Sequence, residues 1–371
     1  MLYSILLFPI IISTGIVLYF LPKIMFLSLK NRLLDRIDNR KVHSTAASRL
    51  GGASFLPAIA VALILTSVFF DGVIQGVNLQ LSSNSLLILC SMIILYFVGL
   101  YDDIVGIRYK KKFLFQFLTA TLVVYSGGYI DNFNGLFGIE AVNIYLGIPL
   151  SIILIVFITN AINLIDGIDG LASMLSIMAF IVYAIMFVLQ RDYVDALFCL
   201  SAVGALTPFW YHNVFGVRKG LAAKIFMGDS GALVVGFLLS VMALKLWGSS
   251  TFDSDSGSRL SENSWILGYT MLIIPCFDVV RVFVYRLVHH KSPFLPDKNH
   301  FHHRLMALGY TSRQSLYLII LFNAVFVTVN WLTALYGVHL MTIILLDIIL
   351  WLAIHRTISY KIKRLGIEIE E

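Results

Sequence analysis

Charged residues are scarce in this chain. Of its 371 residues, 13% are charged and 59% are hydrophobic, whereas about 25% of the residues in an ordinary soluble domain are charged. A soluble core of this composition would have too few polar side chains to cover its surface. The composition therefore excludes a soluble enzyme, a nucleic-acid-binding domain and a disordered scaffold, and it predicts a membrane protein.

Cysteines are few, and the amino terminus has no basic segment. Cys90, Cys199 and Cys276 lie in apolar runs, share no spacing typical of a disulfide framework or a metal site, and are interpreted as small packing residues. No Lys or Arg precedes Lys23, so the first apolar run lacks the basic start of a secretory signal peptide. We expect it to be a retained helix whose amino end is outside.

Apolar runs long enough to cross about 30 Å of hydrocarbon predict an all-α polytopic membrane protein. We expect eleven transmembrane helices within a single integral-membrane domain, residues 1–371. Their approximate ranges are 3–22, 53–70, 84–101, 113–130, 143–163, 170–189, 194–211, 230–248, 264–285, 314–335 and 338–355.

The basic residues predict the orientation of these helices. With the amino terminus outside, all 27 Lys and Arg residues fall on the inner side except Arg191, Lys245, Arg259 and Arg281. We therefore expect an inner-membrane location and a cytoplasmic carboxyl terminus. The expected cytoplasmic loops lie around residues 23–52, 101–112, 160–170, 212–230 and 286–313.

Acidic residues in two of these loops suggest a cation site. Asp102 and Asp103 are adjacent carboxylates, which repel each other and favour a bound cation or a raised pKa; the alternative is a helix end paired to nearby lysines. Asn163, Asp166 and Asp169 recur every three residues in a loop without Lys or Arg, so they share one face. That face requires a cation or a donor-rich ligand, and the alternative is an Asx turn.

Two further motifs lie in inner loops. Asp229, in a Gly-Asp-Ser-Gly sequence before an apolar run, is either a helix N-cap or a ligand for a hard metal ion. His300, His302 and His303 lie beside Arg304, without the usual helical spacing of zinc ligands. Donation to phosphates or sugar hydroxyls suits this basic segment better, and the alternative is a titrating surface cluster.

A basic loop containing Lys41, His43 and Arg49 precedes the second expected span, and by itself it is typical of a segment that contacts anionic lipid. All five motifs nevertheless fall on one membrane face. Acidic pairs, a Gly-Asp turn, histidines and basic residues on one face predict a metal-dependent, anion-binding site. The anion that best matches Mg²⁺ with Lys, Arg and His is a phosphate or diphosphate, and the membrane setting suggests a lipid reactant.

The chain resembles the polyprenyl-phosphate N-acetylhexosamine-1-phosphate transferases. From about Arg40 to Arg304, its motifs follow the order of that family, namely Asp102-Asp103, the sequence Asn-Ala-Ile-Asn-Leu-Ile-Asp-Gly-Ile-Asp-Gly at 160–170, Met227-Gly228-Asp229-Ser230-Gly231 and His300-Phe301-His302-His303-Arg304. The resemblance implies transfer of a sugar 1-phosphate from a UDP-sugar to polyprenyl phosphate with release of UMP, an early step of a cell-envelope glycan. It also implies Mg²⁺ or Mn²⁺ as cofactor, and UDP-GlcNAc or a related UDP-HexNAc as donor.

The resemblance further implies roles for individual residues. Asp229 and Asn163 would be the metal ligands, and Asp102 and Asp103 would orient or deprotonate the lipid phosphate. The remaining residues are expected to bind substrate: Asp166 and Asp169 at the nucleotide and metal, Lys112 and Arg304 at the diphosphate, His300, His302 and His303 at the sugar phosphate, and also Lys41, His43 and Arg49.

A cation-coupled transporter is the alternative class of function. It would carry charged residues at mid-membrane depth on several helices. Only Asp278, Arg281 and Asp347 meet this description, and the first two are spaced as an ion pair. The expected partners are therefore a UDP-sugar, polyprenyl phosphate and membrane lipids, with no nucleic acid, and the sequence leaves a homodimer open.

Overall fold

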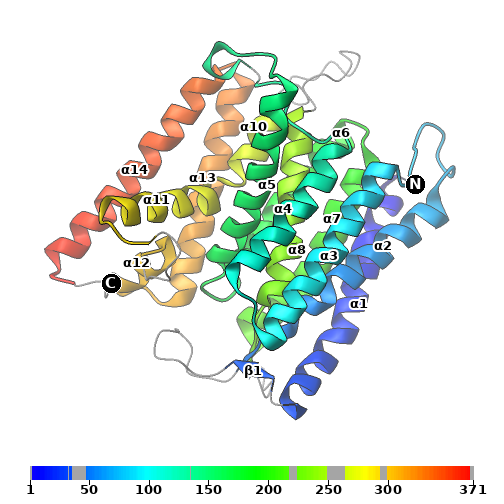
Figure 1. The fold of residues 1–371 in the computed structure, drawn as a ribbon, viewed down its shortest axis with the longest axis horizontal. Helices are drawn as coiled ribbons and strands as arrows, with labels where there is room; N and C mark the ends of the chain where they lie inside the picture. Colours follow the sequence, from blue (N-terminus) through cyan, green and yellow to red (C-terminus); the bar gives the residue numbers. More distant parts are fainter. Residues whose placement is uncertain are drawn as a thin grey trace.

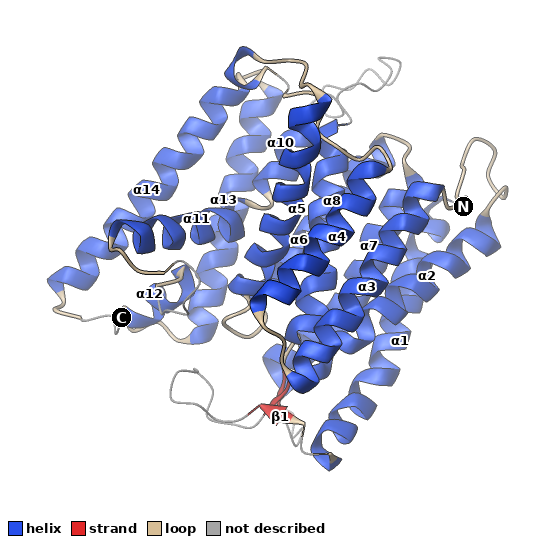
Figure 2. Ribbon diagram, viewed as in Figure 1, coloured by secondary structure: helices blue, strands red, loops and turns tan. Residues whose placement is uncertain are grey.

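The computed structural model describes residues 2–31, 33–35, 47–133, 135–216, 224–248, 264–292 and 299–367. Helices make up most of these residues and run side by side in a bundle (Figures 1 and 2). The three cysteines are free, as expected. The expected all-α fold is confirmed.

The described part of the chain forms fifteen helical segments. Their bounds are α1 Leu2–Lys30, η1 Leu50–Ser54, α2 Phe55–Phe70, α3 Ser83–Val105, α4 Tyr109–Tyr125, η2 Leu136–Gly138, α5 Ile144–Ile165, α6 Leu171–Leu189, α7 Tyr193–Phe215, α8 Gly228–Gly248, α10 Ser264–Thr270, α11 Ile273–Val288, α12 Phe301–Ala307, α13 Ser312–Leu335 and α14 Leu340–Arg364.

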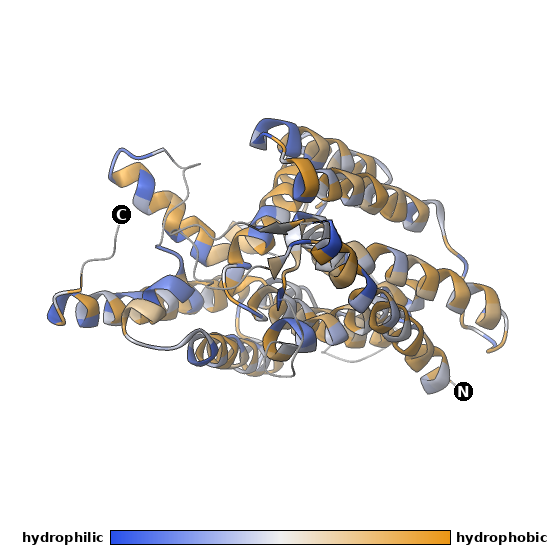
Figure 3. Cartoon of the chain, turned by 90° about the horizontal axis from the view of Figure 1, so that it is seen from below, coloured by the Kyte–Doolittle hydropathy of each residue, from blue (hydrophilic) through white to orange (hydrophobic). Residues whose placement is uncertain are grey.

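Nine of the described helices are long and apolar enough to cross a membrane, so the chain is a multi-pass membrane protein. They correspond to nine of the eleven expected spans. Hydrophobic residues cover the lengths of the helices, while hydrophilic residues gather at helix ends and in loops (Figure 3). The fourth expected span corresponds to α4, which has 17 residues.

The ninth expected span, 264–285, is divided into α10 and α11. The break falls at Met271 and Leu272, and Pro275 lies in the first turn of α11. A proline at this position cannot donate to the carbonyl of Met271, and its ring would clash with that carbonyl in a continuous helix. In Figure 1, α11 lies across the direction of α13 and α14.

Helix α8 lies at the centre of the bundle, and every residue from Ser230 to Met242 is buried. It packs against α3, α5 and α6. A helix that is apolar all round is typical of such an enclosed position. The position of α8 therefore determines where its first turn meets the ends of α3 and α5.

A small sheet guides the chain into α8. Strand β1 (Leu34–Asp35) pairs antiparallel with β2 (Ala47–Ser48), which pairs in parallel with β3 (Lys224–Ile225). The backbone N–H of Gly52 then donates to the carbonyl of Met227 at 2.8 Å. The sheet lies at the lower face of the bundle in Figure 1, at the opposite end from the amino terminus.

The close approach of η1 to the start of α8 can be tested by a substitution at Gly52. A Cβ atom on Gly52 would lie 2.2 Å from the Cα of Gly231, so Gly52→Ala should force α8 away from η1 and destabilise the protein by about 1–3 kcal/mol. Thermal unfolding in detergent would measure this change. Gly15→Ala is the matched control, because nothing lies within 4 Å of a Cβ at Gly15. Equal melting temperatures for the two variants would contradict the prediction.

Candidate functional site

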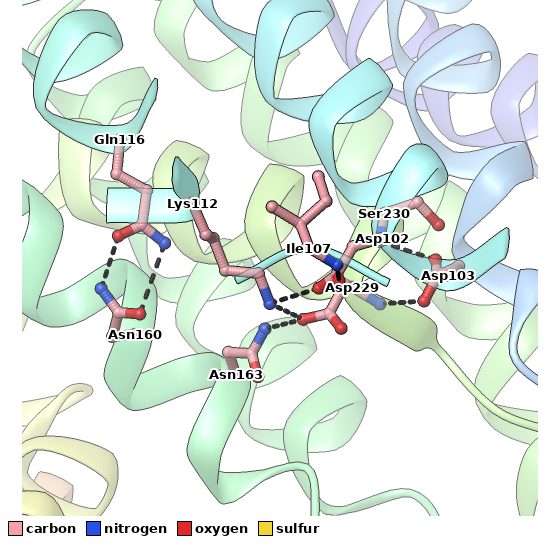
Figure 4. A network of polar contacts seen from close by, with 9 residues as sticks. All are labelled: Asp102, Asp103, Ile107, Lys112, Gln116, Asn160, Asn163, Asp229 and Ser230. Atoms are coloured by element: carbon pink, nitrogen blue, oxygen red, sulfur yellow. Dashed lines mark hydrogen bonds and ion pairs between the residues drawn. The ribbon is translucent and has the colours of Figure 1, made fainter. Parts of the chain in front are cut away.

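Four helix ends bring together side chains that are far apart in the sequence (Figure 4). Asp102 lies in the last turn of α3, Lys112 in the first turn of α4, Asn163 near the end of α5, and Asp229 in the first turn of α8. The structure thus unites Asp102, Asn163 and Asp229 of the sequence motifs with Lys112, which the family resemblance selected.

Asp229 is the centre of this cluster. Its Oδ1 accepts hydrogen bonds from Lys112 Nζ at 2.5 Å and from Asn163 Nδ2 at 2.6 Å. Lys112 Nζ also pairs with Asp102 Oδ2 at 2.8 Å. A single ammonium group therefore bridges two carboxylates, which shows that this position favours a positive charge.

The adjacent carboxylates of Asp102 and Asp103 face different partners. Asp102 Oδ1 accepts from the N–H of Ile107 at 2.5 Å, in addition to its ion pair with Lys112. Asp103 accepts from the N–H groups of Asp229 at 2.7 Å and Ser230 at 2.9 Å. Asp103 is therefore the cap of α8, supplied by another helix, and its negative charge lies at the positive end of the α8 dipole.

The loop between α5 and α6 carries two more carboxylates. Burial raises the pKa of Asp166 to about 7, and the negative charges of Asp169 and Asp229 add to this effect. Asp169 Oδ2 forms an ion pair with Lys224 of β3, while its Oδ1 is buried without a hydrogen-bond partner among the described residues. The loop therefore holds negative charge that the described residues neutralise only in part.

His302 packs directly against this acidic loop. Its side chain is buried, and neither ring nitrogen has a hydrogen-bond partner among the described residues. A Cβ on Gly167 would lie 2.1 Å from His302 Nε2, so only glycine allows this contact. Burial, with His303 nearby, lowers the pKa of His302 to about 3, which keeps its ring neutral. The ring of His303 lies 4.2 Å away.

His300 and Arg304 have other partners. His300 Nδ1 lies 2.8 Å from Asp278 Oδ2, and Asp278 also forms its expected ion pair with Arg281 at 3.1 Å. Arg304 contacts His355 Nδ1 of α14 at 3.2 Å, and burial lowers its pKa to about 10. Asp278 and Arg281, the charged pair that a transporter could use, are therefore engaged with each other, and Asp278 is also engaged with His300.

Arg49 lies immediately before η1, and its carbonyl oxygen is packed against Gly228, where a Cβ would lie 1.9 Å away. Lys41 and His43 fall outside the described residues.

Asn213, near the end of α7, was missed by the sequence motifs. Its Oδ1 accepts from the N–H of Gly170 at 2.6 Å, and its Nδ2 donates to the carbonyl of Ile225 at 2.7 Å. It thereby connects the acidic loop to the strand that leads into α8. A single asparagine at a helix end has no distinctive pattern, so only the tertiary contacts identify it. The sequence likewise does not distinguish Lys224 from the other basic residues expected on the inner side.

The chain is similar to known proteins over this region. The model of the family described as "Glycosyl transferase family 4" matches residues 85–247. A "Probable undecaprenyl-phosphate N-acetylglucosaminyl 1-phosphate transferase" of Bacillus subtilis (strain 168) is 28% identical over 318 residues, which are 85% of this chain and 81% of that protein.

Two further relatives are named undecaprenyl-phosphate alpha-N-acetylglucosaminyl 1-phosphate transferase. The protein of Yersinia pestis is 28% identical over 317 residues, covering 83% of this chain and 80% of the relative. The protein of Escherichia coli (strain K12) is 29% identical over 327 residues, covering 86% of this chain and 83% of the relative.

The bridging role of Asn213 can be tested by its removal. Asn213→Ala should destabilise the protein by about 1–3 kcal/mol, because it leaves a buried N–H and a buried carbonyl without partners. The measurement is thermal unfolding in detergent. Asn78→Ala serves as control, since Asn78 is exposed and accepts one local hydrogen bond from Gln80. A shift no larger than that of the control would show that Asn213 does not join the two segments.

Proposed function

We propose that this chain, which matches the model of glycosyl transferase family 4 over residues 85–247, transfers N-acetylglucosamine 1-phosphate, or a related N-acetylhexosamine 1-phosphate, from a UDP-sugar to undecaprenyl phosphate. The names of the relatives supply the acceptor and the sugar. The observation that carries the proposal is the cluster in which Lys112 bridges Asp229 and Asp102. UMP is the second product.

The reaction is a phosphoryl transfer between two anions. An oxygen of the acceptor phosphate forms a new bond to the β-phosphorus of the UDP-sugar. The bond between that phosphorus and the oxygen bridging to the α-phosphate breaks, and UMP leaves with the electron pair. The protein must therefore position two negative groups and offset their repulsion. Lys112 is a positive group at the centre of the cluster, suited to contact the diphosphate.

Direct attack by the acceptor suits the two adjacent carboxylates better than a phosphorylated enzyme. Both oxygens of Asp103 accept backbone hydrogen bonds, so its role is to position Asp229. Asp102 is held by Lys112 and by the N–H of Ile107, and it is oriented to accept a proton from the acceptor phosphate or to hold that phosphate in place. Neither carboxylate has an oxygen free of these contacts that is poised as a nucleophile.

The oxygen atoms of this cluster suit Mg²⁺. Asp229, Asn163 and Asp166 are the residues that would hold the ion, although Asn163 presents its amide nitrogen to Asp229 in this structure. Among the described residues, no three His, Cys, Asp or Glu side chains form a metal site of their own. Mg²⁺ is commonly held by one or two carboxylates together with substrate phosphates, so this donor set fits. When bound, Mg²⁺ would neutralise charge on the transferred phosphate.

His302 and the acidic loop form the side of the site suited to the donor. His302 is neutral at physiological pH, so one ring nitrogen can donate to a phosphate or hydroxyl oxygen and the other can accept from a sugar hydroxyl. The free Oδ1 of Asp169 is a second acceptor in the same region. Hydrogen bonds from the neutral His302 ring would orient the UDP-sugar without adding a charge to the site.

An apolar cavity supports a long-chain lipid as acceptor. It has a volume of about 240 Å³ and lies between α5, α8, α10 and α11, with Ile158, Leu244 and Phe277 among its lining residues. On α8 the lining begins at Ser240, about 17 Å along the helix from Asp229, a distance that a chain of several isoprenoid units can span. We infer that the cavity accepts isoprenoid units of the acceptor and that the basic face carrying the site is cytoplasmic.

Asp229 provides the direct test. Asp229→Asn should abolish Mg²⁺-dependent release of UMP from a UDP-sugar and undecaprenyl phosphate, with a loss of at least about a thousandfold, because the carboxylate is the centre of the cluster. Formation of labelled lipid gives a second readout. Asp131→Asn is the control, since Asp131 is exposed in the loop before α5. Full activity of a folded Asp229→Asn protein would overturn the assignment.

The raised pKa of Asp166 predicts a dependence on pH. Below about 7 the side chain is protonated, and above this value it is charged. Cation binding favours the charged form, so the Mg²⁺ concentration for half-maximal UMP release should fall as pH rises from about 6 to 8, by up to about tenfold per unit below the pKa.

Asp166→Asn should flatten this dependence. The acceptor phosphate titrates near pH 6 in both proteins, so the difference between them isolates Asp166. An unchanged pH profile in Asp166→Asn would show that this carboxylate does not contribute to cation binding.

A further inference from the structure

A second groove opens between α3 and α4, on the other side of the turn that carries Ile107. Its volume is about 780 Å³. Its lining residues are Ile94, Phe97, Val98 and Tyr101 of α3, the turn Gly106, Ile107 and Arg108, and Lys111 and Phe115 of α4.

The wall of the groove formed by α3 is apolar and exposed. Phe97 is 62% exposed and Tyr101 is 56% exposed, although both lie on a helix long and apolar enough to span the membrane. Tyr96 meets the edge of the Phe97 ring at 5.5 Å between centroids, and more than half of each ring-bearing residue remains exposed. In a bilayer this part of the groove faces lipid, so an acyl chain can enter it from the membrane.

The mouth of the groove is positively charged. Arg108 and Lys111 are exposed, and neither forms an ion pair with a described residue. The next residue, Lys112, is by contrast bound to both Asp102 and Asp229. Successive helical residues point about 100° apart, so the side chain of Lys111 lines the groove while that of Lys112 points to the carboxylate cluster. Two positive charges therefore remain available at the boundary of the membrane.

We propose that this groove is a binding site for an anionic phospholipid of the bilayer. The headgroup phosphate contacts Arg108 and Lys111, and one acyl chain lies along Ile94, Phe97 and Phe115. The combination of a chain-sized apolar wall with two cations that have no ion-pair partner among the described residues selects an anionic over a zwitterionic lipid. The polyprenyl acceptor is a poorer occupant, because its phosphate must reach Asp102 and Asp229, which Lys112 faces and Lys111 does not.

The groove is linked to the candidate active site by one hydrogen bond. Ile107 lines the groove, and its N–H donates to Asp102 Oδ1 at 2.5 Å. A headgroup held by Arg108 restrains this turn and thereby the direction of Asp102. Anionic lipid is therefore expected to increase the transfer rate. This effect rests on the proposed function, whereas binding of the lipid does not.

Binding is tested with the full-length purified protein. The protein is incubated with equal amounts of phosphatidylglycerol and phosphatidylcholine, and the retained lipids are counted by native mass spectrometry. Wild type should retain phosphatidylglycerol about tenfold in excess, and Arg108→Gln/Lys111→Gln should lose most of this preference. Lys110→Gln is the control for Lys111→Gln, because Lys110 carries the same charge and is exposed but does not line the groove.

A test variant and a matched control probe the apolar wall of the groove. Phe97→Ala should weaken retention of phosphatidylglycerol severalfold, whereas Phe117→Ala should not, since Phe117 is also exposed but lies outside the groove. Thermal unfolding verifies that each variant is folded. In nanodiscs, added phosphatidylglycerol should raise UMP release by wild type and not by Arg108→Gln/Lys111→Gln.

Three results would overturn the proposal. Equal losses in Lys110→Gln and Lys111→Gln would indicate diffuse attraction to the membrane surface. Displacement of phosphatidylglycerol by undecaprenyl phosphate, with a higher acceptor KM in the groove variants, would assign the groove to the acceptor. Equal retention of the two phospholipids by wild type would remove the site. Because retention requires no turnover, it is independent of the outcome for the proposed reaction.

Discussion

The carboxylate of Asp103 holds the amino end of α8, and the geometry of the site depends on this contact. It accepts from two backbone N–H groups at the start of a helix that is otherwise enclosed by its neighbours. Unpaired N–H groups in such surroundings would cost about 1–3 kcal/mol each. The cap joins α3 to α8 and brings Asp229 next to Asp102. Lys112 can then bridge both carboxylates from α4, and Asn163 reaches Asp229 from α5.

The sequence predicted the parts of this arrangement that depend on hydropathy and on ordered motifs. Long apolar runs predicted the helices, the motifs placed Asp102, Asn163 and Asp229 on one membrane face, and the family resemblance added Lys112. The different roles of Asp102 and Asp103 could not be predicted. Both are aspartates at neighbouring positions, and they differ only in the direction in which the folded helix points each side chain. The break before α11 was obscured because Pro275 lies in an otherwise continuous apolar run.

The histidine segment shows a second limit of motif reasoning. Its four polar residues are close in sequence, yet His302 contacts the acidic loop through Gly167 while Arg304 contacts His355 of α14. The family match ends at residue 247, before this segment and before α14. Its relation to the site therefore rests on packing. Phe301 adds to this packing, since its ring lies 4.9 Å from His355 and 5.4 Å from Trp351.

The central position of α8 also has a consequence for assembly in the membrane. The ribosome delivers α3, α5 and α6 before α8, yet α8 packs against all three. The earlier helices therefore cannot complete their packing until α8 has been inserted. The parallel pairing of β2 with β3 likewise requires the later part of the chain. The carboxylate cluster thus forms only after about two thirds of the chain has been synthesised, so truncated chains released before that point carry no assembled site.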